Sequence, residues 1–155
     1  MRIVFVCIGN VCRSPFAERY FNKRCRDINL PHVASSGGTV PYRYGIPHEA
    51  IEAARIFSVN LSDHVPRYVG DVIKVFRPDL VLTMERNLVD EVKCICEIHG
   101  IDVPVTTLIG YITGIDDDIE DPFGHDITTY LRVYSTIAHY IDKLLEILNK
   151  RRDKV

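Results

Sequence analysis

The sequence predicts a three-layer α/β fold, in which helices cover both faces of a four-stranded parallel sheet. Two observations support this prediction. Short apolar runs alternate along the chain with longer amphipathic segments, which is the rhythm of strands connected by helices. The apolar runs also lack a clean alternation of apolar and polar residues, as expected for strands that are buried on both faces. A single domain is expected over residues 1–155, because 46% of the residues are hydrophobic and no low-complexity tract interrupts the chain.

The strands and helices of this fold can be assigned in chain order. Strands are expected at RIVFVC, HVASSG, DLVLTM and PVTTLI, which are residues 2–7, 32–37, 79–84 and 104–109. Helices are expected at residues 15–27, 48–57, 86–100 and 126–150. The last of these segments has apolar residues at helical spacing, which predicts a long closing helix. Gly, Pro, Asp and His cluster in the loops, and α/β folds place their chemistry in the loops that follow the strands.

Composition and charge exclude several classes of protein. The formal net charge is −2, and the basic residues are dispersed apart from a short run near the end of the chain. Neither nucleic-acid binding nor membrane binding is therefore indicated. The N-terminal apolar run ends at Cys7, far short of a signal peptide or of the roughly 20 residues of a membrane span. Five cysteines, an odd number, argue against a secreted disulfide framework, so a cytoplasmic location is expected.

The segment CIGNVCRSP, residues 7–15, carries the strongest chemical signal. The first strand delivers Cys7 to its carboxyl end, and a helix begins a few residues later. Gly9 and Asn10 tolerate positive φ, so backbone N–H groups can turn toward an anion, to which the helix N-terminus adds partial positive charge. Arg13 contributes a planar guanidinium that matches two phosphoryl oxygens. We therefore expect a phosphate-binding loop after the first strand, with Cys7 as a nucleophile biased toward its thiolate form.

Phosphoryl transfer through a cysteine also needs a group that protonates the leaving oxygen and later takes a proton from water. The loop GIDDDIEDPFG offers five candidate carboxylates, and composition alone does not choose among them. Asp121 stands out because Pro122 restricts its backbone and Phe123 could shield it from water. A solvated acidic loop is the expectation for the others, which are Asp116, Asp117, Asp118 and Glu120.

The stretch VCIGNVCRSP resembles the signature of the low-molecular-weight protein tyrosine phosphatases, in which a cysteine is followed by five residues, an arginine and a serine. Further motifs occur in the order and at the approximate distances found in that family, namely SGGT (36–39), HVPR (64–67), VLTMERNL (81–88) and DPFG (121–124). The resemblance therefore spans nearly the whole chain. It implies a cofactor-free enzyme that hydrolyses phosphotyrosine in proteins through a cysteinyl-phosphate intermediate.

The resemblance also implies a role for individual residues. Asp121 is the general acid and base, and it acts together with Cys7 and Arg13. The phosphoryl group is bound by the loop residues Ile8, Gly9, Asn10, Val11, Cys12 and Ser14. In addition, Ser14 would stabilise the leaving thiolate. Ser36 is the hydroxyl partner of Asn10, and His64 is a helix-borne member of the same polar network. Glu85 stands where the family has aspartate, so we leave it out of the expected site.

Cys12 raises a separate question, because it lies five residues beyond Cys7 in a curved loop. The resemblance implies that its thiol condenses with oxidised Cys7 to a protective disulfide, which a thioredoxin-like reductant could reopen. Thioredoxin-coupled arsenate reductases share this loop and fold, but Cys94 and Cys96 sit later and closer together than their relay cysteines. A phosphate-binding module without turnover is the third alternative, disfavoured because a nucleophile and a candidate acid are both present.

The substrate preference rests on few positions. Tyr42, Tyr44 and Phe123 are expected to form an aromatic wall that suits phosphotyrosine. The similar protein arginine phosphatases usually carry Thr where this chain has Val11, so Val11 favours phosphotyrosine as the substrate. They often carry a glycine at the position of Gly124, so Gly124 favours phosphoarginine. We give more weight to Val11, because that position faces the substrate. No metal is expected, since no His or Cys set at zinc spacing accompanies the loop cysteines. A monomer is expected.

Overall fold

The structure is a computed structural model and describes residues 1–153. A parallel sheet of four strands forms its centre, in the order β2-β1-β3-β4. β1 (Arg2–Cys7) runs between β2 (Val33–Gly38) and β3 (Leu80–Thr83), and β4 (Val105–Thr107) is the outer neighbour of β3. Because the strands are parallel, their carboxyl ends meet at one edge of the sheet.

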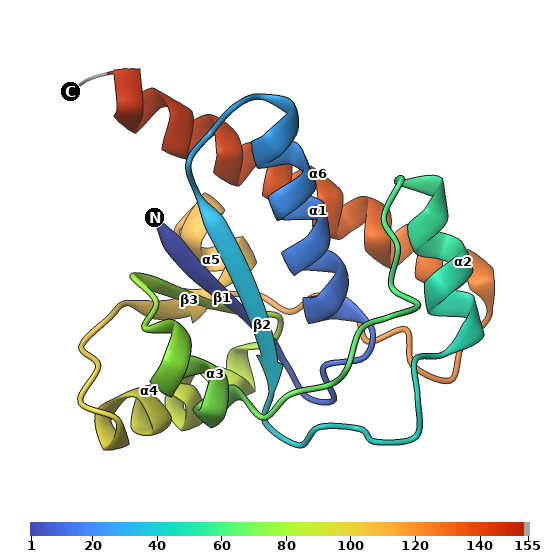
Figure 1. Cartoon of the computed structure of the whole chain (residues 1–155), viewed down its shortest axis with the longest axis horizontal. Helices are drawn as coiled ribbons and strands as arrows, with labels where there is room; N and C mark the ends of the chain where they lie inside the picture. Colours follow the sequence, from blue (N-terminus) through green and yellow to red (C-terminus); the bar gives the residue numbers. More distant parts are fainter. Residues whose placement is uncertain (154–155) are drawn as a thin grey trace.

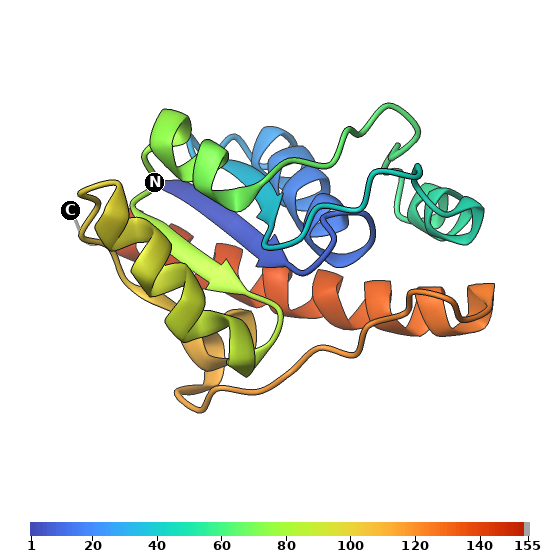
Figure 2. The ribbon, with the colours of Figure 1, turned by 90° about the horizontal axis from the view of Figure 1, so that it is seen from below.

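Helices cover both faces of this sheet, as Figures 1 and 2 show. One face is covered by α1 (Arg13–Asp27), α5 (Leu108–Thr113) and α6 (Ile127–Asp153), with α2 (His48–Ile56) packed against α6. The other face is covered by α3 (Val69–Phe76) and α4 (Val89–Ile98), and a single 3₁₀ turn, η1 (Arg86–Leu88), precedes α4. The predicted three-layer α/β fold is confirmed. No helix within residues 1–153 is long and apolar enough to cross a membrane.

The central strand shows why the apolar runs lack alternation. Ile3 and Phe5 pack into the core beneath α1 and α6, whereas Val4 and Val6 pack into the core beneath α3 and α4. All four side chains are fully buried. Both faces of β1 therefore need apolar residues, because water reaches neither of them.

Two helices were not anticipated from the sequence. The segment PVTTLI forms a strand only as far as Thr107, whose hydroxyl accepts a hydrogen bond from the backbone N–H of Gly110 at 2.8 Å and so caps α5. The expectation that the strand continues to residue 109 is therefore wrong. The other helix is α3, in which Val69, Val72 and Ile73 form a buried apolar stripe. This stripe is too short for the helical period to be recognised in the sequence.

The two glycines at the end of β2 allow close packing next to the carboxyl end of β1. A Cβ atom on Gly38 would lie 2.5 Å from the carbonyl oxygen of Ile8, and one on Gly37 would lie 2.6 Å from the Cα atom of Val69. Any side chain at these positions would displace the loop after β1 or the start of α3. The SGGT motif thus fits β2 closely against the loop that contains the expected site.

Candidate active site

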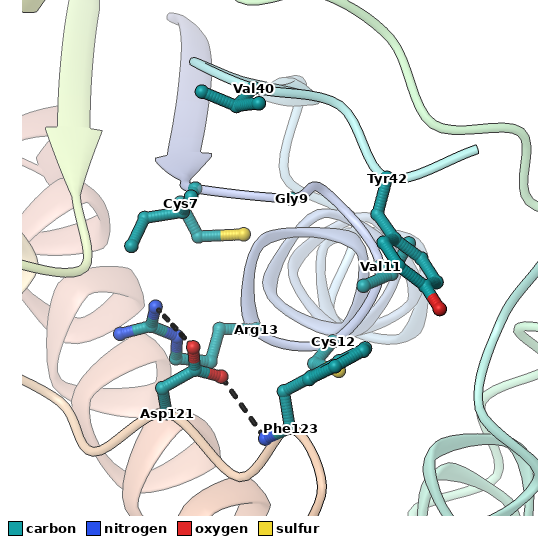
Figure 3. A pocket seen from close by; sticks show the side chains of 10 residues that line it. Cys7, Gly9, Val11, Cys12, Arg13, Val40, Tyr42, Asp121 and Phe123 are labelled. Carbon is teal, nitrogen blue, oxygen red and sulfur yellow. Dashed lines mark hydrogen bonds and ion pairs between the residues drawn. The ribbon is translucent and has the colours of Figure 1, made fainter. Parts of the chain in front are cut away.

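Cys7 is the last residue of β1, and it lies at the floor of a cavity formed by the loop that leads to α1 (Figure 3). The side chain is 3% exposed. Its Sγ atom lies 2.9 Å from the Oγ atom of Ser14, which belongs to the first turn of α1. A hydroxyl at this distance can donate a hydrogen bond to a sulfur anion, so Ser14 is placed to stabilise the charged form of Cys7.

The backbone of the loop between β1 and α1 is free to bind an anion. Asn10 has a φ of 54°, as the sequence led us to expect, whereas Gly9 does not adopt a positive φ. Among the hydrogen bonds within residues 1–153, none has a backbone N–H of residues 9–12 as its donor. These N–H groups lie at the N-terminus of α1, where the helix dipole favours negative charge.

Arg13 is almost completely buried, at 1% exposure, and its guanidinium is held by residues outside the loop. Its Nη1 atom donates to the carbonyl oxygen of Ile119 at 2.7 Å and lies 3.3 Å from Oε1 of Glu85. The Nη2 atom lies 3.6 Å from Oδ2 of Asp121. The buried Nε atom has no partner within residues 1–153. An oxyanion in the cavity would satisfy this remaining N–H group.

Asp121 is the one carboxylate of the acidic loop that lines the cavity, and Figure 3 shows it across from Cys7. Its Oδ1 atom accepts a hydrogen bond from the backbone N–H of Phe123 at 3.1 Å, which fixes the orientation of the carboxylate. The side chain remains 43% exposed, so Phe123 shields it less than the sequence suggested. A group in this position can exchange protons with both a leaving group and water.

The rest of the acidic loop is anchored by hydrogen bonds and ion pairs. Asp116 accepts bonds from the hydroxyls of Thr106 and Thr107, at 2.6 and 2.8 Å, and these bonds hold the pKa of its carboxyl below the ordinary value. Asp118 accepts a bond from the backbone N–H of Arg86 at 2.7 Å and also pairs with its guanidinium, and its pKa is likewise lowered. All four carboxylates of this group, Asp116, Asp117, Asp118 and Glu120, are exposed, as expected for a solvated loop, and Asp116 and Asp118 are in addition anchored to the strand ends and η1.

A buried network of polar side chains supports the loop from below. Asn10 donates from Nδ2 to the hydroxyls of Ser14, at 2.8 Å, and Ser36, at 3.0 Å. Its Oδ1 atom accepts bonds from Nε2 of His64, at 3.1 Å, and from the backbone N–H of Arg67, at 3.0 Å. One amide side chain thus satisfies four partners, and the side chains of Asn10, Ser14 and Ser36 are fully buried rather than exposed in the cavity.

His64 holds the loop through its ring nitrogen. Nε2 also contacts the backbone carbonyl of Asn10 at 3.0 Å, so both of its partners are acceptors and the nitrogen carries a proton. Burial lowers the pKa of His64 to about 4, which keeps the ring neutral at neutral pH. The expectation that His64 is helix-borne is wrong, because it lies in the irregular segment between α2 and α3.

Cys12 is buried at the start of α1, and α6 holds it in place. Its Sγ atom lies 3.4 Å from the hydroxyl of Tyr130, and its backbone carbonyl accepts a bond from the hydroxyl of Tyr134 at 2.9 Å. Burial raises the pKa of the Cys12 thiol to about 12. Cys12 is therefore a neutral thiol at neutral pH.

Aromatic and apolar side chains form the wall of the cavity on the side of Val11. The rings of Tyr42 and Phe123 meet edge to face at 5.0 Å, and the backbone N–H of Tyr42 donates to the carbonyl of Gly9 at 2.9 Å. Tyr44 does not line this cavity. It packs on Tyr42 at 5.3 Å and is 88% exposed.

Three residues of this site lie outside the expected set: Glu85 was named but left out, and Glu18 and Tyr130 were not considered. Glu85 pairs with Arg13, Glu18 accepts bonds from Ser36 and Arg67 at 2.8 and 2.6 Å, and Tyr130 contacts Cys12. A signal existed for Glu85, because it follows β3 almost directly and β3 ends beside β1. No local pattern indicated Glu18 or Tyr130, whose positions depend on how α1 and α6 pack.

The fold and the cavity are those of a cysteine-dependent phosphatase, in which a thiol follows a buried strand and an anion-binding loop surrounds it. A family model described as low molecular weight phosphotyrosine protein phosphatase matches residues 2–154. The chain belongs to this family.

Individual relatives agree with this assignment. The low molecular weight protein-tyrosine-phosphatase PtpB of Staphylococcus epidermidis is 31% identical over 146 residues, which cover 93% of this chain and 96% of that protein. The solved structure of the YwlE arginine phosphatase from Geobacillus stearothermophilus has a TM-score of 0.83 at 26% identity and covers 99% of this chain and 96% of that chain. The low molecular weight protein tyrosine phosphatase from T. tengcongensis has a TM-score of 0.81 at 30% identity, with coverages of 94% and 98%.

Proposed function

We propose that this enzyme hydrolyses phosphotyrosine in protein substrates through a cysteinyl-phosphate intermediate. The observation that carries the proposal is the cavity over Cys7, which brings a sulfur nucleophile, an unpartnered guanidinium N–H of Arg13 and the carboxylate of Asp121 together. These are the nucleophile, the anion-binding group and the proton donor that phosphoryl transfer to a side chain requires.

In the first step, the phosphoryl oxygens bind the free N–H groups of residues 9–12 and the Nε atom of Arg13. The Cys7 sulfur attacks phosphorus from the floor of the cavity and forms the S–P bond, while the P–O bond to the tyrosine breaks. Asp121 gives its proton to the departing phenolate oxygen. The fixed N–H groups need no reorganisation as negative charge shifts onto the equatorial oxygens.

In the second step, a water molecule attacks the cysteinyl phosphate. Asp121, now a carboxylate, takes a proton from that water, and the S–P bond breaks to release inorganic phosphate. The Ser14 hydroxyl, 2.9 Å from the sulfur, stabilises the thiolate that leaves. Ile119 and Glu85 hold the guanidinium of Arg13 in one orientation through both steps.

The aromatic wall supports phosphotyrosine as the substrate. Tyr42 and Phe123 line the cavity and can pack against an aryl ring, and the methyl groups of Val11 add apolar surface without a hydroxyl. Gly124, which the sequence analysis took as a sign of an arginine phosphatase, has a φ of 81°. Its backbone conformation explains the glycine without reference to substrate.

Phosphoarginine is the second candidate substrate, because one of the similar solved structures is named an arginine phosphatase. A comparison of phosphotyrosine, phosphoserine and phosphoarginine peptides on the purified enzyme separates the two. We expect a preference for tyrosine that shifts toward arginine in Val11→Thr, since the added hydroxyl can contact a guanidinium. A parent enzyme that prefers phosphoarginine would overturn the assignment to tyrosine.

The cellular setting follows from the chemistry of the thiols. All five cysteines are free in the structure, which suits a reducing compartment, and we propose the cytoplasm as the location. We further propose that the enzyme works as a monomer and that a thioredoxin-like reductant reopens a Cys7–Cys12 disulfide after oxidation.

A further inference from the structure

A second cavity lies directly beside the catalytic cavity, and the reaction described above does not use it. Tyr42 and Phe123 line both cavities, so this ring pair is the partition between them. On its far side the second cavity is lined by Tyr44, Glu49 and Tyr130. A side chain placed there would therefore neighbour the residue whose phosphoryl group lies over Cys7.

Four of the residues that line the second cavity are aromatic, namely Tyr42, Tyr44, Phe123 and Tyr130. The ring of Tyr42 lies 5.3 Å from that of Tyr44, at an interplanar angle of 60°, and 5.0 Å from that of Phe123, at 71°. The three rings are thus inclined to one another rather than stacked. The negative faces of such rings attract cations, and the attraction grows as the cation loses water.

Glu49 supplies a negative charge to the same cavity. It lies in the first turn of α2, and no ion pair or hydrogen bond engages its carboxylate within residues 1–153. Two carboxylates of the nearby acidic loop differ in this respect, since Asp118 pairs with Arg86 and Glu120 pairs with Arg132. Glu49 and Tyr130 line the same cavity, and the charge of Glu49 adds to burial in raising the pKa of Tyr130.

We propose that this second cavity is a subsite for a basic side chain, a lysine or an arginine, that lies within about two residues of the phosphorylated residue in the substrate. The proposal rests on the proposed function and adds the sequence context that the enzyme prefers. The aromatic faces and the carboxylate of Glu49 together select a cation. An acidic neighbour would be repelled, and an apolar one would bury the rings but leave the carboxylate without a partner.

Tyr44 acquires a role in this arrangement. It lies outside the catalytic cavity, and its ring is next to that of Tyr42, which separates the two cavities. The residue is nevertheless 88% exposed to solvent. As the outer ring of the subsite, Tyr44 would become covered when a basic side chain enters. The exposed ring of Tyr44 in the free enzyme is then a binding surface that is not yet occupied by substrate.

The test uses three phosphotyrosine peptides that differ only beside the phosphorylated residue, with lysine, methionine or glutamate at the flanking positions. We expect kcat/KM to rank lysine above methionine above glutamate, with about a 3- to 10-fold step between lysine and methionine. In Glu49→Gln the ratio of lysine to methionine peptide should fall toward one. Glu52→Gln on the same helix removes the same charge outside the cavity and should keep the parent ratio.

A second pair of variants tests the aromatic part. Tyr44→Leu should reduce the lysine-to-methionine ratio, whereas Tyr44→Phe should keep it, because only the ring is required. Equal rates on the lysine and methionine peptides in the parent enzyme would overturn the subsite, as would an equal loss on all peptides in Glu49→Gln. If phosphotyrosine peptides are not cleaved at all, the proposed substrate is wrong, and the same variants then decide the subsite with phosphoarginine peptides of the same design.

Discussion

Replacement of Asn10 by alanine tests whether the buried network holds the phosphate-binding loop. The side chain donates two hydrogen bonds and accepts two, and its partners are the hydroxyls of Ser14 and Ser36, the ring of His64 and the backbone N–H of Arg67. At about 0.5–1.5 kcal/mol for each bond, the loss of all four costs roughly 2–6 kcal/mol. Alanine has a Cβ atom but no polar side chain to stabilise a φ of 54°, so this backbone conformation adds about 1 kcal/mol to the loss of stability.

The assay is urea denaturation of parent and variant, followed by kcat with p-nitrophenyl phosphate. We expect the free energy of unfolding to fall by about 3–7 kcal/mol and kcat to fall as well, because the loop N–H groups lose their fixed positions. Asn10→Gly is the matched control, since it removes the same bonds but accepts positive φ, and it should be about 1 kcal/mol more stable than Asn10→Ala. A loss below about 1 kcal/mol in Asn10→Ala would refute the idea that this network holds the loop.

Four further predictions follow from the site. Asp121→Asn should lower kcat with phenyl phosphate by about 10²- to 10⁴-fold but have a smaller effect with p-nitrophenyl phosphate, whose leaving group needs less help from an acid; equal losses would argue against the acid role. Peroxide should inactivate the enzyme, and dithiothreitol should restore the parent better than Cys12→Ser, with peptide mapping to detect a Cys7–Cys12 disulfide. Because burial lowers the pKa of His64 from 6.5 to about 4, its contribution to stability is complete above pH 6.5 and is lost as the pH falls toward 4; denaturation midpoints of His64→Gln should lack this slope. EDTA should leave activity unchanged, since no cluster of three His, Cys, Asp or Glu side chains suited to a metal occurs within residues 1–153.

Local sequence was sufficient to place Cys7 and Arg13 at one cavity. Cys7 and Arg13 are close in the chain and sit on a strand, a short loop and a helix start, so their relative position depends on few torsion angles. The parallel sheet could also be predicted from the sequence, because the apolar runs are long enough to be recognised as strands that are buried on both faces. The choice of Asp121 among five carboxylates needed the family resemblance, since it depends on how the loop before α6 crosses the carboxyl ends of the strands.

Contacts between elements that are distant in the chain could not be predicted in the same way. Glu85 was set aside because it departs from the family pattern, yet its longer side chain still reaches Arg13 at 3.3 Å. Tyr130 contacts Cys12 only because α6 packs along α1. Tyr44 was expected in the substrate wall beside Tyr42, but it lines the neighbouring cavity and not the catalytic one. Side-chain direction in an irregular loop is not encoded by spacing alone.

The central claim is that Cys7 carries the phosphoryl group during turnover. The most direct measurement is to mix the enzyme with a phosphotyrosine peptide, quench with acid within the first turnover, and locate the phosphoryl group by mass spectrometry of the proteolytic peptides. The account predicts that the peptide containing Cys7 gains the mass of one phosphoryl group on sulfur, that the gain disappears as substrate is exhausted, and that Cys7→Ala shows neither the gain nor turnover. A phosphoryl group found on another residue, or turnover that persists in Cys7→Ala, would contradict it.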